Sequence, residues 1–175
     1  MQTIWLFTSV HAFIDSEISI FPFNADIASV GETLSQIDDI KKDDEIIQLL
    51  NADAIAGKNH IIHGVNQAFL AFDRGENLAK DISVEIVVRC SAQRQISKAF
   101  NILGLKEGNM DLCAVLVNCI DYSNDLSNLF DRNDDVLSAD VDKLKEIYKI
   151  GDVELENMSA EDILVDRITK LTVDY

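Results

Sequence analysis

Residues 51–96, NADAIAGKNHIIHGVNQAFLAFDRGENLAKDISVEIVVRCSAQRQI, contain the clearest helical pattern in the chain. Between about residues 58 and 74 its apolar residues recur at steps of three and four, which predicts an amphipathic helix with one buried face. That face consists of Ile61, Val65, Ala68, Phe69 and Phe72. Gly57 precedes this helix, Lys58 opens it, and Arg74-Gly75 closes it in the usual way for a helix C-terminus.

Lys58 is the unusual residue of this helix. A cation in the first turn opposes the helix dipole, at a cost of up to about 1 kcal/mol. The free N–H groups of a helix N-terminus, together with a lysine, also form a place where an anion such as a phosphate can be held. The sequence therefore predicts an anion site at Gly57-Lys58.

The same arrangement is expected a second time, further along the stretch. Residues 84–90 (VEIVVRC) are short and rich in β-branched residues, which predicts a buried strand. Ser91 follows as an expected N-cap of a second helix, which begins near Gln93 and ends at Gly104. Its apolar positions are Ile96, Ala99, Phe100 and Leu103. Arg94 is placed in the first turn of this helix, which predicts a second site for negative charge.

Three segments, NADAIAGKNH, FDRGENLAKD and VEIVVRCSAQRQI, occur in this order and together carry a resemblance to a known family. They resemble the small regulatory subunit of the KEOPS complex, the PRPK-binding-protein family, and especially its archaeal members. The resemblance is strong over about residues 46–117 and weaker in both flanks. One departure is visible at Ala92, where the family has Gly in a Ser-Gly-x-Arg-Gln-Ile turn.

The resemblance implies a non-catalytic subunit that docks on an atypical kinase-like ATPase and raises its ATPase or autophosphorylation activity. It also implies binding of the single-stranded CCA end of tRNA, within a complex that makes threonylcarbamoyl-adenosine in tRNAs reading ANN codons through a separate catalytic subunit. The expected tRNA-binding residues are Lys58, Arg74, Gly75, Asn77, Lys80, Arg94 and Gln95. Two alternatives stay open: a kinase adaptor that does not contact tRNA, and a small enzyme that uses Gly57-Lys58 to bind a phosphorylated metabolite.

Charge is unevenly distributed along the chain. The formal net charge is −16, yet residues 58–106 carry a net +3 and the remainder −19. A locally basic centre in an acidic chain favours a small, directed anion site and argues against broad coating of a duplex, so DNA is not an expected partner. A tRNA contact through about three cations would give a salt slope of roughly −2 on a single strand.

Length and composition indicate one domain with a core of its own. The chain has 175 residues, of which 47% are hydrophobic. No apolar run approaches the roughly 20 residues needed to cross a membrane, so no membrane association is expected. The start, MQTIWLFTSVHAFID, lacks a basic region, and no signal peptide is expected. The three cysteines are an odd number and are interpreted as reduced thiols of a cytoplasmic protein.

The remaining segments complete the expected fold, an α/β (mixed α+β) single domain in which helices pack on a mixed β-sheet. Further strands are expected at 2–8, 46–51 and 112–117, and short helices at 25–34, 139–149 and 160–170. Asn24 is the expected cap of the first of these helices, and Ser159 with Asp162 of the last. Pro22 is expected to mark a turn or a sheet edge, and residues 121–135 a mobile loop.

Other chemistries fit less well. The segment 52–59 fails as a nucleotide-binding P-loop because Ala52 and Asn59 replace the required Gly and Ser or Thr. His60 and His63 lack the carboxylate pattern of a metal site, and the acidic run 131–142 lacks the glycine and glutamate of a calcium loop. No cofactor or metal is therefore expected.

Two further expectations concern the side chains of Arg89 and Cys90 in the predicted strand 84–90 and the positions of the phenylalanine rings. In a strand Arg89 and Cys90 would point to opposite faces, so Arg89 would not activate the thiol. Phe69, Phe72 and Phe100 lie on stripes that should face the core. A stacked base would then have to use an arginine plane or an aliphatic surface.

Overall fold

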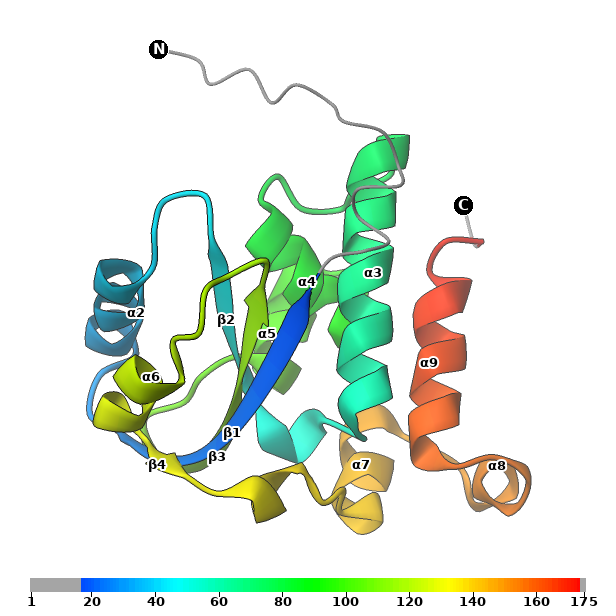
Figure 1. Cartoon of the computed structure of the whole chain (residues 1–175). Coiled ribbons are helices and arrows are strands. Elements are labelled where there is room, and N and C mark those ends of the chain that lie inside the picture. The colour runs from blue at the N-terminus through cyan, green and yellow to red at the C-terminus, as the bar shows by residue number, and fades with distance from the viewer. Residues whose placement is uncertain (1–16, 174–175) are drawn as a thin grey trace.

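Four antiparallel strands form the sheet of the computed structural model, which describes residues 17–173 (Figure 1). The strands are β1 Ile18–Ile27, β2 Ile46–Asn51, β3 Gly108–Val117 and β4 Asp131–Arg132, in the order β2-β3-β1-β4. Val117 of β3 pairs with both Ile18 and Ile46, which fixes the register of the three long strands. The described strands therefore pair only in the antiparallel sense, and the parallel component of the expected mixed sheet is absent from residues 17–173.

Helices cover both faces of this sheet (Figure 1). The helices are α2 Val30–Ile40, α3 Lys58–Arg74, α4 Ile82–Cys90, α5 Ile96–Leu103, α6 Ser123–Leu129, α7 Val141–Tyr148, α8 Asp152–Asn157 and α9 Ala160–Lys170, with single 3-10 turns at Ala52–Ala54 and Asp134–Leu137. Alternate residues of β3 serve two cores. Cys113, Val115 and Val117 pack with α3, α4, α5, α7 and α9. Leu112, Ala114 and Leu116 pack with α2 and α6. The expected fold class, a single domain of helices packed on a sheet, is confirmed.

The organising helix α3 has the predicted bounds. Ile61, Val65 and Ala68 are fully buried, as their spacing requires. The helix ends at Gly75, which adopts the left-handed conformation with φ of 69°. Glu76 N–H donates to the Ala71 carbonyl and Gly75 N–H to the Phe72 carbonyl, the bonds of a Schellman motif.

The segment expected as a strand at 84–90 is instead the helix α4, and that prediction was wrong. The Asp81 side chain accepts hydrogen bonds from the N–H groups of Ser83 and Val84, which caps the helix. Every residue from 85 to 90 is buried, including Glu85 and Arg89, so no solvent-exposed stripe marks the helical period. A short run of this kind, apolar apart from these two residues, cannot be assigned from periodicity alone, and packing on α3 overrides the strand preference of its β-branched residues.

Several smaller predictions are also corrected. The first helix runs from Val30 and is capped by Ser29, not Asn24, because residues 25–27 continue β1. Pro22 lies inside β1, opposite Cys113, and marks no turn. Residues 121–135 are not one loop, since they contain α6 and β4. The C-terminal helices at 139–149 and 160–170 are confirmed as α7 and α9, whereas α8 was not predicted. The strand expected at 2–8 lies outside the described residues.

Candidate nucleic-acid interface

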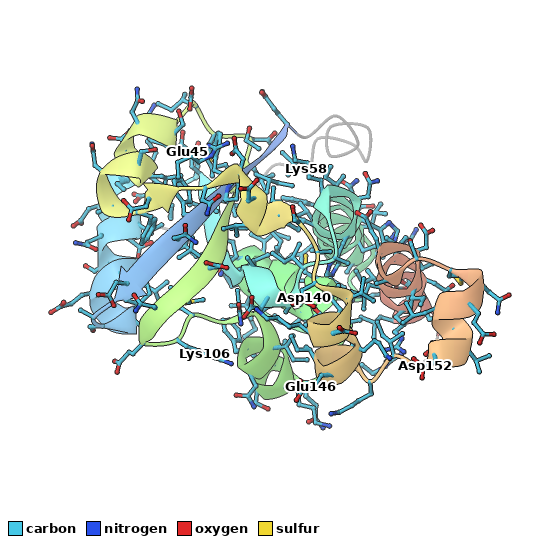
Figure 2. The ribbon with its side chains drawn as sticks, turned by 90° about the horizontal axis from the view of Figure 1, so that it is seen from below. Glu45, Lys58, Lys106, Asp140, Glu146 and Asp152 are labelled. Carbon is cyan, nitrogen blue, oxygen red and sulfur yellow. The ribbon has the colours of Figure 1, made fainter. Side chains whose placement is uncertain are left out.

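The structure separates the predicted tRNA-binding residues into different places. Lys58 and Arg74 are the two ends of the 17-residue helix α3, about 24 Å apart at 1.5 Å per residue. Figure 2 likewise shows Lys58 well apart from Lys106, the other end of the net-positive segment. The predicted tRNA-binding residues therefore do not form one patch, and they fall at the two ends of α3, in the turn before α4 and in the turn before α5.

At the start of α3 an internal carboxylate holds the position where an anion was predicted. Gly57 has no side chain with which to cap the helix, and the Glu161 Oε1 atom of α9 accepts a hydrogen bond of 3.0 Å from His60 N–H. A Cβ atom added at Gly57 would lie 2.5 Å from the same oxygen. The physical expectation of negative charge at this helix end is fulfilled within the chain, and Lys58 beside it is exposed.

His60 completes the structure of this helix end. Its Nδ1 accepts a hydrogen bond of 3.0 Å from Ala56 N–H, so Nε2 carries the proton and donates it to the Cys90 carbonyl at 2.7 Å. Burial lowers the pKa of His60 to about 4. His63 instead pairs with Thr169 through its Nε2 at 2.8 Å. The two histidines therefore serve separate packing roles, and residues 17–173 contain no grouping of His, Cys, Asp or Glu that could hold a metal ion.

The turn between α3 and α4 presents exposed Arg74, Gly75 and Lys80 on a tightly held backbone. Its support is an ion pair inside α4, Arg89 Nε to Glu85 Oε1 at 2.7 Å, with both side chains essentially inaccessible to solvent. Arg89 is thus not a surface cation. Asn77, also a predicted contact, donates from its side-chain amide to the Ala79 carbonyl at 2.8 Å.

The turn between α4 and α5 holds the other predicted contacts. Gln95 is the N-cap of α5, so Arg94 precedes the helix and does not lie in its first turn as predicted, and Ser91 is the C-cap of α4. The Gln95 side chain makes no capping hydrogen bond. Arg94 Nη2 donates to the Leu171 carbonyl at the end of α9, at 3.3 Å. These residues border a shallow hollow lined by Ala92, Gln93, Arg94, Gln95, Lys98 and Leu171.

Ala92 explains why the related turn carries glycine. Its φ is 53°, in the left-handed region that disfavours a residue with a Cβ atom by roughly 1–2 kcal/mol. The turn keeps the conformation that a glycine would adopt without strain. Alanine at this position therefore lowers stability relative to glycine.

Aromatic rings are arranged differently from the expectation. Phe69 is buried, but Phe100 is 39% exposed, so its predicted burial was wrong. Phe100 follows Lys98 by two residues on α5, a rotation of about 200° at 3.6 residues per turn, and the two side chains point to different sides of the helix. The ring is consequently not part of the hollow beside Lys98.

The thiol of Cys90, next to Arg89 in the sequence, is not activated as a nucleophile. Cys90 lies at the end of α4, and burial raises the pKa of its thiol to about 12. Arg89 is directed to Glu85 and to the Glu76 carbonyl, so it does not activate the sulfur. The thiol is protonated near neutral pH and packs as a small apolar group.

Sequence comparison places this fold in a class of regulatory proteins. The model of the family described as "Kinase binding protein CGI-121" matches residues 25–170, and the chain belongs to this family. A curated relative, the "Regulatory protein Cgi121" of Methanocaldococcus jannaschii, is 37% identical over 107 residues, which cover 59% of this chain and 70% of the relative. The resemblance to the KEOPS regulatory subunit is thereby confirmed. Within residues 17–173, no helix is both long and apolar enough to cross a bilayer.

Proposed function

We propose that this chain is the cytoplasmic, non-catalytic subunit of a KEOPS-type complex that binds and activates the kinase-like ATPase and holds the CCA end of tRNA. The description of its family as kinase-binding supports the first part. The printed name of the relative from Methanocaldococcus jannaschii, a regulatory protein, supports a non-catalytic role.

The observation that supports RNA binding is the placement of cations at both ends of α4. Arg74 and Lys80 lie before this helix, and Arg94 lies after it with Lys98 close by in sequence. The nine residues of α4 separate the two turns by about 12 Å. At about 3.4 Å per nucleotide, this spacing matches three or four nucleotides of one strand, the length of a tRNA 3′ end.

The adaptor without tRNA binding is the second candidate, and one observation favours it. Glu161 already supplies a carboxylate at the start of α3, where it accepts from His60 N–H, so the chain itself places negative charge at that predicted anion site. The same carboxylate argues against an enzyme that binds a phosphorylated metabolite there, because the metabolite would have to displace it.

A gel-shift experiment separates the two candidates. The purified chain is titrated into tRNA with the CCA end, tRNA without it, and a single-stranded oligonucleotide that ends in CCA. We expect binding of the first and third, with a log–log salt slope of roughly −2 for about three phosphates. No binding of any of the three would support the adaptor, and a slope several times steeper would indicate duplex coating.

The kinase part is tested with the cognate kinase-like subunit. We expect a stable heterodimer on size-exclusion chromatography and a higher ATP turnover than that of the kinase-like subunit alone. Separate elution of the two proteins at micromolar concentration would contradict this part of the proposal and leave the RNA part standing.

A further inference from the structure

Outside α4, the side chains of the buried ion pair hydrogen-bond to the backbone of the turn between α3 and α4. Glu85 Oε2 accepts from Leu78 N–H at 2.9 Å and from Ala79 N–H at 2.7 Å. Arg89 Nη2 donates to the Glu76 carbonyl at 3.2 Å. The pair therefore fixes the backbone at Glu76, Leu78 and Ala79, between the end of α3 and the start of α4.

Stability by itself does not account for an ion pair in this place. Removing two charges from water is unfavourable, and buried pairs in other proteins can be replaced by apolar residues of similar volume with little loss or even a gain of stability. What apolar replacements could not supply here is the set of acceptors and donors for the backbone of residues 76–79. Without the pair, the N–H groups of Leu78 and Ala79 would lose the carboxylate oxygen that accepts from both.

We infer that Glu85 and Arg89 are positioning residues for nucleic-acid binding, which hold the turn so that Arg74 and Lys80 are presented in one fixed geometry. Arg74 ends α3 and Lys80 directly follows the tethered Ala79. Long cationic side chains gain affinity when their backbone is already ordered, since less conformational entropy is lost on binding. This inference rests on the proposed tRNA-binding function, to which it adds two residues that touch no ligand.

The test uses the double variant Glu85→Met with Arg89→Met in the full chain. The paired apolar replacement avoids an uncompensated buried charge, which either single substitution would create. We expect the Leu78 and Ala79 amides to exchange with solvent at least tenfold faster by NMR. We also expect affinity for a CCA-ending oligonucleotide to fall about tenfold, as for loss of one charge-assisted contact, with a shallower salt slope.

A matched control is the double variant Lys145→Ala with Asp152→Ala, which removes an exposed ion pair far along the chain from this turn. Its amide exchange at residues 78 and 79 and its RNA affinity should equal those of the unmodified chain. Should the Met/Met variant not fold, the double variant Glu85→Gln with Arg89→Met, which keeps one side-chain acceptor and leaves no buried charge, provides the second measurement, with a smaller loss of affinity expected.

The outcomes distinguish the inference from the proposal beneath it. An unmodified chain that does not bind the oligonucleotide would overturn the proposed tRNA function and this inference with it. If the unmodified chain binds, and a variant with faster exchange at residues 78 and 79 binds equally well, the pair is only structural and the inference alone is wrong. Lower thermal stability with unchanged affinity and salt slope of the folded protein leads to the same conclusion.

Discussion

The starts of α3 and α5 carry the same local features but have different surroundings. Both helices lack a capping hydrogen bond from their own N-cap residue and lack an acidic residue in the first turn. At α3, Glu161 supplies a carboxylate from α9. At α5, the neighbouring part of α9 supplies a carbonyl, that of Leu171, which accepts from Arg94. The same C-terminal helix thus brings negative charge to one start and a neutral acceptor to the other.

This difference shows what a cation beside a helix start does and does not predict. The pattern correctly indicates that negative charge is favourable at the N–H groups of a helix start. It does not indicate whether the charge comes from a ligand or from the chain itself. The α3 start is a closed structural unit built from Gly57, His60 and Glu161, whereas the α5 start borders an open hollow.

We expect the largest change in the free energy of unfolding from Gly57→Ala, which disrupts the closed unit at the start of α3. Its φ of 155° and ψ of 178° lie in a region restricted to glycine, and a Cβ atom would displace the Glu161 carboxylate. The strain and the lost cap together should lower the free energy of unfolding by roughly 3–4 kcal/mol in urea denaturation. Gly31→Ala is the control, because its Cβ would meet only Ser29 Oγ at 3.9 Å. That variant should gain up to about 1 kcal/mol in the helix, and equal losses for both would contradict the closed-unit model.

The second prediction concerns pH and the same unit. Because burial lowers the pKa of His60 from 6.5 to about 4, the unfolded chain takes up this proton before the folded one does. The stabilisation is complete above about pH 6.5 and is lost as the pH falls toward 4, a contribution of about 3 kcal/mol. An NMR titration should show the His60 ring neutral at pH 5. A transition near pH 6.5 would mean that the α3 start is open to water.

The third prediction compares the two cations. Arg94→Ala should weaken binding of a CCA-ending oligonucleotide about ten- to a hundredfold, the value of a charge-assisted phosphate contact. Lys58→Ala should weaken it less than tenfold, because the neighbouring Glu161 carboxylate repels a phosphate. Kinase binding serves as the control and should be unchanged in both. Equal losses of affinity in the two variants would show that Lys58 contributes as much as Arg94 to oligonucleotide binding.

The smallest effect is expected from Ala92→Gly in the open turn. Relief of the left-handed strain at Ala92, partly offset by the flexibility of glycine in the unfolded chain, should raise the free energy of unfolding by about 1 kcal/mol. Thermal unfolding checks the sign against Gly75→Ala, which places a Cβ at another left-handed position and should have the opposite effect. A loss of stability in Ala92→Gly would show that the turn is held by something other than its backbone conformation.

Elements with local signals could be predicted from the amino-acid sequence. Helix α3, strand β2 and helices α7 and α9 were predicted close to their observed bounds, because a 3.6-residue period, a capping serine or a terminal glycine lies within each segment. The family was also predicted, from motifs that occur in order within residues 51–96. For the proposed site, the sequence predicted which cationic residues take part, and this stays a prediction, but it did not predict their positions relative to one another.

Other features depend on contacts between distant parts of the chain, because the local sequence is compatible with more than one structure there. Residues 84–90 are helical because Asp81 caps the helix and because it packs on α3, and the burial of residues 85–90 hides the period that identifies a helix. The anion at the α3 start comes from Glu161, which is 101 positions from His60 along the chain. The sequence of the capped segment does not indicate a carboxylate that comes from a distant helix, since the contact forms only when α9 packs against α3.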